Sequence, residues 1–202
     1  MILLYSFGGN TMPLKNKLSS HELILNMVYI ALFVVLITIC SWISIPMQVP
    51  FTLQTLAVFA TIGMLGGKKA TIVILIYILL GMVGLPVFSN FQGGFGVIFG
   101  STGGYIIGFL CITLLCWLIQ KWIQNKLVAM IVGMGIGMIL MYAFGTIWFM
   151  HVYIQNTGKI TLWTALGWCV FPFIIPDLIK MVIAIIVSLR LSKYVKIKPN
   201  SV

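Results

Sequence analysis

Long apolar runs alternate along this chain with short segments rich in proline, glycine or lysine. A helix that crosses a membrane needs about 20 mainly apolar residues, and fewer where neighbouring helices or interfacial residues compensate. The pattern predicts six crossings, at residues 23–44, 53–65, 70–83, 105–122, 127–150 and from the last proline pair to residue 191. The second is the shortest, because about 13 helical residues cover only about 20 Å of a hydrocarbon core about 30 Å thick.

Prolines and glycines mark the breaks between these runs. Pro46 and Pro50 end the first, since proline lacks the N–H that a helix interior needs. The connection between the third and fourth runs is SNFQGGFGVIFGSTGGY, which is uncharged and has six glycines between residues 93 and 104. Pro172 and Pro176 divide the last apolar stretch into an interfacial piece and a final helix.

The composition is typical of one class of protein. Of its 202 residues, 61% are hydrophobic and 7% are charged, whereas soluble domains have about 25% charged residues. We therefore expect an all-α integral membrane protein, a six-helix bundle in the cell membrane. The expected organisation is an N-terminal cytoplasmic extension at 1–19, the membrane domain at 20–192 and a basic cytoplasmic tail at 193–202. No function is assigned to residues 1–11.

The basic residues indicate an orientation. Ten of the 12 fall on one side of the predicted six-crossing bundle, with only Lys159 opposite and Lys180 inside the membrane. The ten are Lys15, Lys17, Lys68, Lys69, Lys121, Lys126, Arg190, Lys193, Lys196 and Lys198. Because positively charged loops stay in the cytoplasm, both termini are predicted to be cytoplasmic. The net charge of +10 is then explained by the orientation of the chain in the membrane, and binding to nucleic acid is not expected.

Only two acidic side chains occur in the chain, Glu22 and Asp177. Asp177 follows Pro176, a residue type suited to the first turn of a helix, where the helix dipole favours a carboxylate. Lys180 lies three residues further on and therefore on the same helix face. Ionisable groups inside a membrane usually face a cavity or a functional path. The alternative is an intrahelical ion pair that only neutralises itself.

Polar side chains of the loop between the third and fourth crossings could join this pair. Asn90 and Gln92 offer amide donors and acceptors. Aromatic residues that could pack on an apolar ring flank them, namely Phe88, Phe91, Phe95 and Tyr105. Together these features predict an outward-open site for a small, mostly apolar molecule with a few hydrogen-bonding groups.

No motif for chemistry or for energy supply is recognisable. The segment GMLGGKKAT lacks the Ser or Thr that a phosphate-binding loop needs after its lysine. His21 and His151 have no nucleophile motif beside them, and the four cysteines lie singly in apolar runs. We therefore expect no catalytic residues, no metal and no cofactor, but a binding and translocation subunit energised by another protein. A stand-alone proton-coupled carrier using Asp177 and an intramembrane enzyme acting on a lipid or peptide are the alternatives.

Three segments in order along the chain resemble the BioY family, the biotin-specific S components of energy-coupling factor (ECF) transporters. They are VPFTLQTLAVFATIGMLGGKKA, LLGMVGLPVFSNFQGGFGVIFGSTGGYIIGF and PFIIPDLIKMVIA, within a likeness that covers about residues 21–191. The resemblance implies the six-helix S-component fold with a biotin site near the outer face. It also implies partners, namely a membrane coupling protein (T component) and two cytoplasmic ATPases. ATP is then used only by these partner subunits.

The resemblance also implies site residues. Asn90 in FSNFQGG, and Asp177 with Lys180 in PDLIK, match the family's polar ligand contacts, while Gln54 in PFTLQT and Tyr105 in TGGY are lesser candidates. Asp177 and Asn90 could accept from the ureido N–H groups of biotin, and Lys180 could meet either the ureido oxygen or the carboxylate. Another small vitamin with an amide-like ring is compatible with the same groups.

One feature departs from the family pattern. S components often carry small residues four apart on their first helix, where they dock on the coupling protein. Here the best match is Ala31 with the bulkier Val35.

Overall fold

The computed structural model describes residues 20–192, so the predicted N-terminal extension and basic tail lie outside the described residues. Helices dominate the described chain. The elements are α1 (Ser20–Trp42), β1 (Ser44–Ile45), β2 (Phe51–Thr52), α2 (Gln54–Leu65), α3 (Gly67–Met82), η1 (Ser89–Phe91), α4 (Phe95–Ile98), α5 (Gly103–Trp122), α6 (Lys126–Asn156), α7 (Leu162–Cys169) and α8 (Phe171–Leu191).

Four stretches of the described chain are long and apolar enough to cross a membrane. They are Ser20–Trp42, Gly103–Trp122, Lys126–Asn156 and Leu162–Leu191, the last combining α7 and α8. This confirms the prediction of a largely helical, multi-pass membrane protein. Helix α2 has only 12 residues, and nearly all of them are buried, because it packs against α8, α1 and α3. A helix surrounded by protein need not match the thickness of the lipid around it.

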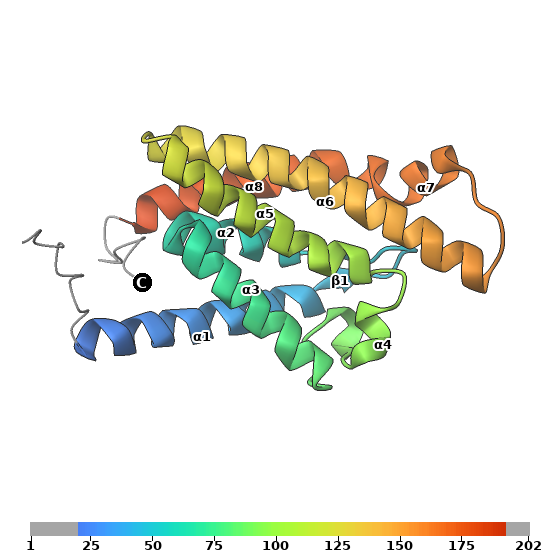
Figure 1. Ribbon diagram of the computed structural model, residues 1–202, viewed down its shortest axis with the longest axis horizontal. Coiled ribbons are helices and arrows are strands. Elements are labelled where there is room, and N and C mark those ends of the chain that lie inside the picture. Colours follow the sequence, from blue (N-terminus) through green and yellow to red (C-terminus); the bar gives the residue numbers. More distant parts are fainter. Residues whose placement is uncertain (1–19, 193–202) are drawn as a thin grey trace, which may run out of the picture.

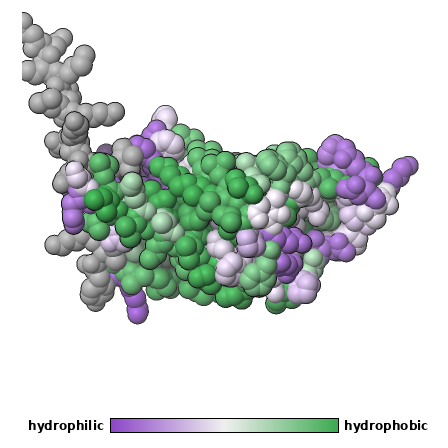
Figure 2. Space-filling view, turned by 90° about the horizontal axis from the view of Figure 1, so that it is seen from below, coloured by the Kyte–Doolittle hydropathy of each residue, from purple (hydrophilic) through white to green (hydrophobic). Residues whose placement is uncertain are grey.

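The long helices lie along one axis of the molecule (Figure 1). The start of α1, the α2–α3 and α5–α6 connections and the end of α8 gather at one end, which we call the lysine end because it carries Lys68, Lys121, Lys126 and Arg190. The β1–β2 hairpin, α4 and α7 lie toward the opposite end, the hairpin end. Figure 2 shows apolar surface over the middle of the molecule and polar residues gathered toward its two ends.

The hairpin interrupts the chain where the sequence predicted a break. Strands β1 and β2 are antiparallel, with Ser44 opposite Thr52 and Ile45 opposite Phe51. Pro46 and Pro50 lie in the connection between the strands, where the missing N–H of a proline interrupts no helix or ladder. The hairpin places Thr52 two residues before the start of α2.

The prediction that Pro176 lies in the first turn of the last helix is wrong. Helix α8 begins at Phe171, with Pro172 in its first turn and Pro176 inside the helix. The N–H groups of a first turn have no intrahelical partner, so Pro172 costs no hydrogen bond there and the helix can start earlier. Asp177 therefore lies in the second turn, and its location depends on its side-chain partners more than on the helix dipole.

Glycines bring α5 and α6 into close contact. A Cβ at Gly104 or Gly108 of α5 would overlap the side chain of Trp148 or Met141, and one at Gly145 of α6 would overlap the Tyr105 ring. Small residues of this kind let membrane helices approach closely, where dispersion and interhelical hydrogen bonds hold them. The packing fixes the position of Tyr105, which lines the site described below.

Candidate functional site

A cavity lies among β2, α2, α5, α6, α7 and α8, with about 600 Å³ of empty space when its open mouth is included. Its polar lining consists of Thr52, Gln54, Thr55, Ser89, Thr102, Tyr105, Tyr142, Asp177 and Lys180. The apolar lining consists of Val49, Pro50, Phe88, Ile106, Phe109, Met141, Cys169 and Phe173. Apolar walls combined with convergent polar groups are typical of sites for small molecules. We call this the main cavity.

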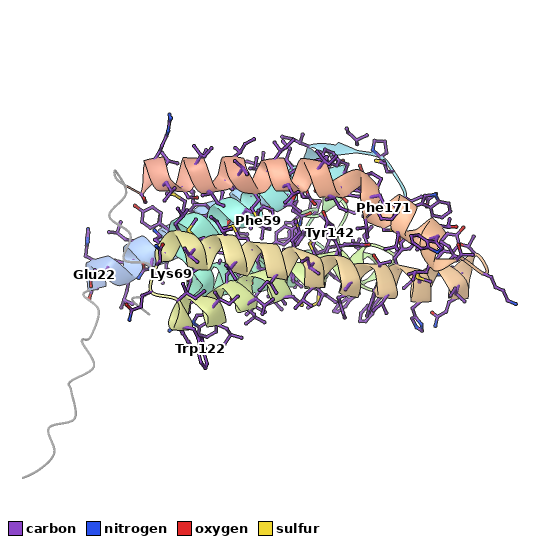
Figure 3. The ribbon with its side chains drawn as sticks, turned by 90° about the horizontal axis from the view of Figure 1, so that it is seen from above. Glu22, Phe59, Lys69, Trp122, Tyr142 and Phe171 are labelled. Carbon is purple, nitrogen blue, oxygen red and sulfur yellow. The ribbon has the colours of Figure 1, made fainter. Side chains whose placement is uncertain are left out.

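Asp177 is held by residues from two other helices as well as its own. Its Oδ1 accepts from Thr55 Oγ1 of α2 at 2.8 Å and from Lys180 Nζ at 2.8 Å. Its Oδ2 accepts from the hydroxyl of Tyr142 of α6 at 2.7 Å. Figure 3 shows Tyr142 on α6, between this helix and α8. A carboxylate has about four acceptor positions, so it can accept about one donor beyond these three.

The ammonium of Lys180 has three acceptors. Besides Asp177 it donates to the Thr52 carbonyl at 2.8 Å and to Thr55 Oγ1 at 3.1 Å. Its Nζ also lies 4.1 Å from the centroid of the Phe51 ring, within the range of a cation–π contact. An ammonium has three N–H donors. A ligand that binds Lys180 must therefore replace one of these protein acceptors or share it.

The pair faces the interior of the bundle. Asp177 is 2% exposed and Lys180 6%, whereas Leu178 and Ile179 on the opposite side of α8 are 42% and 55% exposed. Two charges removed from solvent need excellent geometry and further hydrogen bonds to be tolerated, and Thr55, Tyr142 and Thr52 supply those bonds. Lys180 lines the main cavity and does not extend its ammonium toward the aqueous interface.

Two of the lesser sequence candidates also line the main cavity. Gln54 is buried and donates from Nε2 to the hydroxyl of Tyr77 at 2.9 Å. Tyr105 is buried, and its hydroxyl lies 3.0 Å from Thr146 Oγ1. Each side chain thus has a protein partner that fixes its orientation toward the cavity.

Asn90 lies apart from the other predicted residues. It is exposed, belongs to η1 and lines a second cavity together with Gln92 and Ser101. The two cavities adjoin, because Pro50 and Thr102 line both. We call the second one the outer cavity.

The hairpin region holds Asn90 in place. Its Oδ1 accepts from Ser44 Oγ at 3.0 Å, and the neighbouring Phe91 ring stacks on Trp42 with centroids 4.9 Å apart. Asn90 and Phe91 have φ values of 56° and 57°, a region that asparagine tolerates and phenylalanine rarely adopts. These contacts connect the end of α1 to the loop that carries Asn90.

Sequence reasoning missed the three residues whose hydrogen bonds hold the Asp177–Lys180 pair. Thr52 and Thr55 flank Gln54 inside the segment PFTLQT, and Tyr142 lies in the middle of the long apolar helix α6. A signal existed for Tyr142, since a buried tyrosine hydroxyl needs a hydrogen-bond partner. Nothing in the sequence pairs it with Asp177.

Comparison with known proteins identifies the family. The sequence model described as the BioY family matches residues 12–197. The chain belongs to the BioY family.

Its relatives in the BioY family cover most of the chain. The protein named biotin transporter BioY from Thermotoga maritima is 38% identical over 164 residues, which is 80% of this chain and 92% of the relative. The biotin transporter BioY of Rhodobacter capsulatus is 34% identical over 181 residues, 84% of this chain and 94% of the relative.

A solved structure shares the fold. It is described as the S-component for biotin from an ECF-type ABC transporter, and it matches with a TM-score of 0.74 and 28% sequence identity. The match covers 88% of this chain and 95% of that one. The resemblance to the BioY family and to the S-component fold, inferred from three sequence segments, is thus confirmed.

Proposed function

We propose that this BioY-family chain is the substrate-binding subunit of a biotin uptake system and that biotin binds in the main cavity. The observation that carries the proposal is the buried Asp177–Lys180 pair, which lines a cavity with both apolar and polar walls and is braced by hydrogen bonds from separate elements. Relatives named biotin transporters along most of the chain support biotin as the ligand.

The chemistry of biotin suits these groups. Its ureido ring has two N–H donors and a carbonyl acceptor, and its fused sulfur-containing ring is apolar. We assign an ureido N–H to Asp177, which can accept about one donor beyond its three protein partners. Hydrogen bonds to a charged group contribute about 1.5–3 kcal/mol each, so this contact would dominate the affinity.

The remaining candidates take lesser roles in this proposal. Phe173 lines the main cavity and can pack on the apolar ring of the ligand. Its ring centroid lies 5.9 Å from that of Phe51, which supports it from the side of Lys180. Gln54 and Tyr105 line the same cavity. Asn90 lies in the outer cavity, so it can contact only a part of the ligand that extends beyond the main cavity.

We also propose that the chain crosses the cell membrane six times with both termini in the cytoplasm. Helices α1, α2, α3, α5, α6 and α8 supply the crossings, and the lysine end faces the cytoplasm by the charge bias of membrane proteins. The hairpin end then faces outward, together with the outer cavity and the mouth of the main cavity.

Energy for uptake would come from partner subunits, a T component and two ATPases, because the sequence has no phosphate-binding loop. Reconstituted alone into vesicles, the chain is expected to bind biotin without accumulating it when a pH gradient is imposed. Radiolabelled biotin uptake checks this. Net accumulation that collapses with the gradient would instead establish the proton-coupled carrier.

The function is tested by titrating purified protein with biotin and with biotin methyl ester. We expect saturable binding of one biotin per chain. If Lys180 contacts the ureido oxygen, the ester binds within about threefold of biotin; if Lys180 meets the carboxylate, the ester is weaker by about tenfold or more, as loss of a charge-assisted hydrogen bond requires. Absence of biotin binding in correctly folded protein would reject the proposed function.

A further inference from the structure

We propose that the lysine end binds the headgroup of an anionic phospholipid between α3 and α5. Two lysines from different helices approach one tryptophan ring there. Lys121 Nζ of α5 lies 4.9 Å from the centroid of Trp117, and Lys68 Nζ of α3 lies 6.0 Å from the same centroid. Both ammonium groups thus lie beside the same ring, and in the proposed complex the two long lysine side chains close on one phosphate.

The backbone fixes this arrangement. The N–H of Gly67 donates to Gln120 Oε1 at 2.9 Å. A Cβ at Gly67 would overlap the backbone of Trp117, so α3 begins in direct contact with α5. Because Lys68 follows Gly67 and Lys121 follows Gln120, the two lysines are set by this helix contact and not only by flexible side chains.

The charge at this end is strongly unbalanced. Asp177 pairs with Lys180 inside the bundle, which leaves Glu22 as the one other acidic side chain in the sequence. Within residues 20–192, Lys121 has no carboxylate partner and contacts the Trp117 ring. Lys126 is exposed at the start of α6, close to the same connection. Basic sites between membrane helices on the cytoplasmic side attract anionic lipid headgroups.

An apolar stripe leads away from the lysines along α5. Leu114, Leu118 and Trp122 follow one another at intervals of four residues, so they share one helix face. They are 40%, 49% and 86% exposed, and Figure 3 shows Trp122 projecting outward near the end of α5. Exposed tryptophans favour the interface between the lipid tails and water.

The combination favours a phospholipid over an acidic protein surface. A phospholipid presents a phosphate at the level of the lysines and acyl chains alongside Leu114 and Leu118. A soluble acidic partner would use the lysines but would leave the apolar stripe without a role. The buried Lys69, which donates to Asn26 Oδ1 at 2.8 Å, belongs to the α1–α3 contact and is not assigned to the headgroup.

The test is lipid retention by purified protein from nanodiscs made of equal parts phosphatidylglycerol and phosphatidylcholine, measured by native mass spectrometry. We expect the natural chain to retain phosphatidylglycerol preferentially. Lys68→Gln or Lys121→Gln alone should weaken this preference by about fivefold. The double variant that carries both substitutions should weaken it by about 25-fold. Lys159 is exposed and is not one of the two lysines beside Trp117. Lys159→Gln is therefore the matched control and should keep the preference.

Two results would overturn the proposal. One is equal retention of the two lipids by the natural chain, which would indicate that the lysines bind an acidic protein surface. The other is a similar loss in Lys159→Gln, which would reduce the effect to net charge. Lys121→Gln alone serves if the double variant does not fold, and Lys121→Arg should restore the preference because it keeps the charge. None of these outcomes depends on biotin binding.

Discussion

Asp177→Asn is expected to weaken biotin binding by about 100-fold, the loss of one strong hydrogen bond to a charged acceptor. The amide has nearly the shape of the carboxylate, but it has one acceptor oxygen and carries no charge. Thr55 and Tyr142 both donate to the carboxylate in the structure, and one of these donors would face the new NH₂ group. Titration of purified protein with biotin measures the affinity.

The same substitution should also lower stability, because it leaves the ammonium of Lys180 buried without its anion. Breaking one side of a buried pair costs about 3–5 kcal/mol. A second variant separates the two effects. In Asp177→Asn with Lys180→Met no charge remains in the cavity, so thermal stability should recover while biotin affinity stays low.

Ser188→Ala is the matched control on the same helix. Ser188 Oγ is buried and has no hydrogen-bond partner among the residues that the structure describes. Its removal should leave biotin affinity unchanged and should not lower the melting temperature. If Asp177→Asn and Lys180→Ala both bind biotin as the natural chain does, the charges form a structural ion pair and the site lies elsewhere.

Gly67→Ala is expected to destabilise the bundle by about 3 kcal/mol, as strong overpacking does. The added methyl group would overlap the backbone N of Trp117 and lie 2.8 Å from the carbonyl carbon of Cys116. Since these are backbone atoms of α5, no side-chain rotation relieves the contact. Helix α3 would have to move away and lose the hydrogen bond from Gly67 to Gln120. Thermal unfolding in detergent measures the loss.

Gly135→Ala provides the comparison for this prediction. Gly135 lies inside α6 with no atom within 4 Å of an added Cβ, so the methyl group meets no protein. Alanine is favoured over glycine in a helix by about 1 kcal/mol, and the variant should be at least as stable as the natural chain. Equal destabilisation in both variants would show that lost glycine, and not the α3–α5 contact, is responsible.

Local patterns were enough to predict the long helices. The apolar runs at 23–44, 105–122 and 127–150 correspond to α1, α5 and α6, although α6 continues to Asn156. The runs could be recognised because each is apolar over the thickness of a bilayer, whatever it packs against. The pairing of Asp177 with Lys180 was also local, since residues three apart meet on any helix, and the contact is present at 2.8 Å.

Contacts between distant segments could not be predicted in this way. Thr55 and Asp177 are 122 residues apart, and Tyr142 and Asp177 are 35 apart. Such pairs depend on which helices adjoin and how each is rotated, and neither follows from the periodicity of one helix. Asn90 shows the converse, because it was expected beside Asp177 yet lines the outer cavity, whereas its loop neighbours Phe88 and Ser89 line the main one.

The sequence by itself therefore determined that this is a multi-pass helical membrane protein of the BioY family with one ionisable pair inside its last helix. Composition, run length and spacing are properties of a single segment, and a bilayer selects them directly. Only the tertiary structure decided that the pair faces a cavity and is held by hydrogen bonds from Thr52, Thr55 and Tyr142. It also decided that α8 starts at Phe171 and that Lys68 and Lys121 both lie beside the Trp117 ring. These features arise from the packing of helices far apart in the chain, where close contact at glycines sets which side chains can meet.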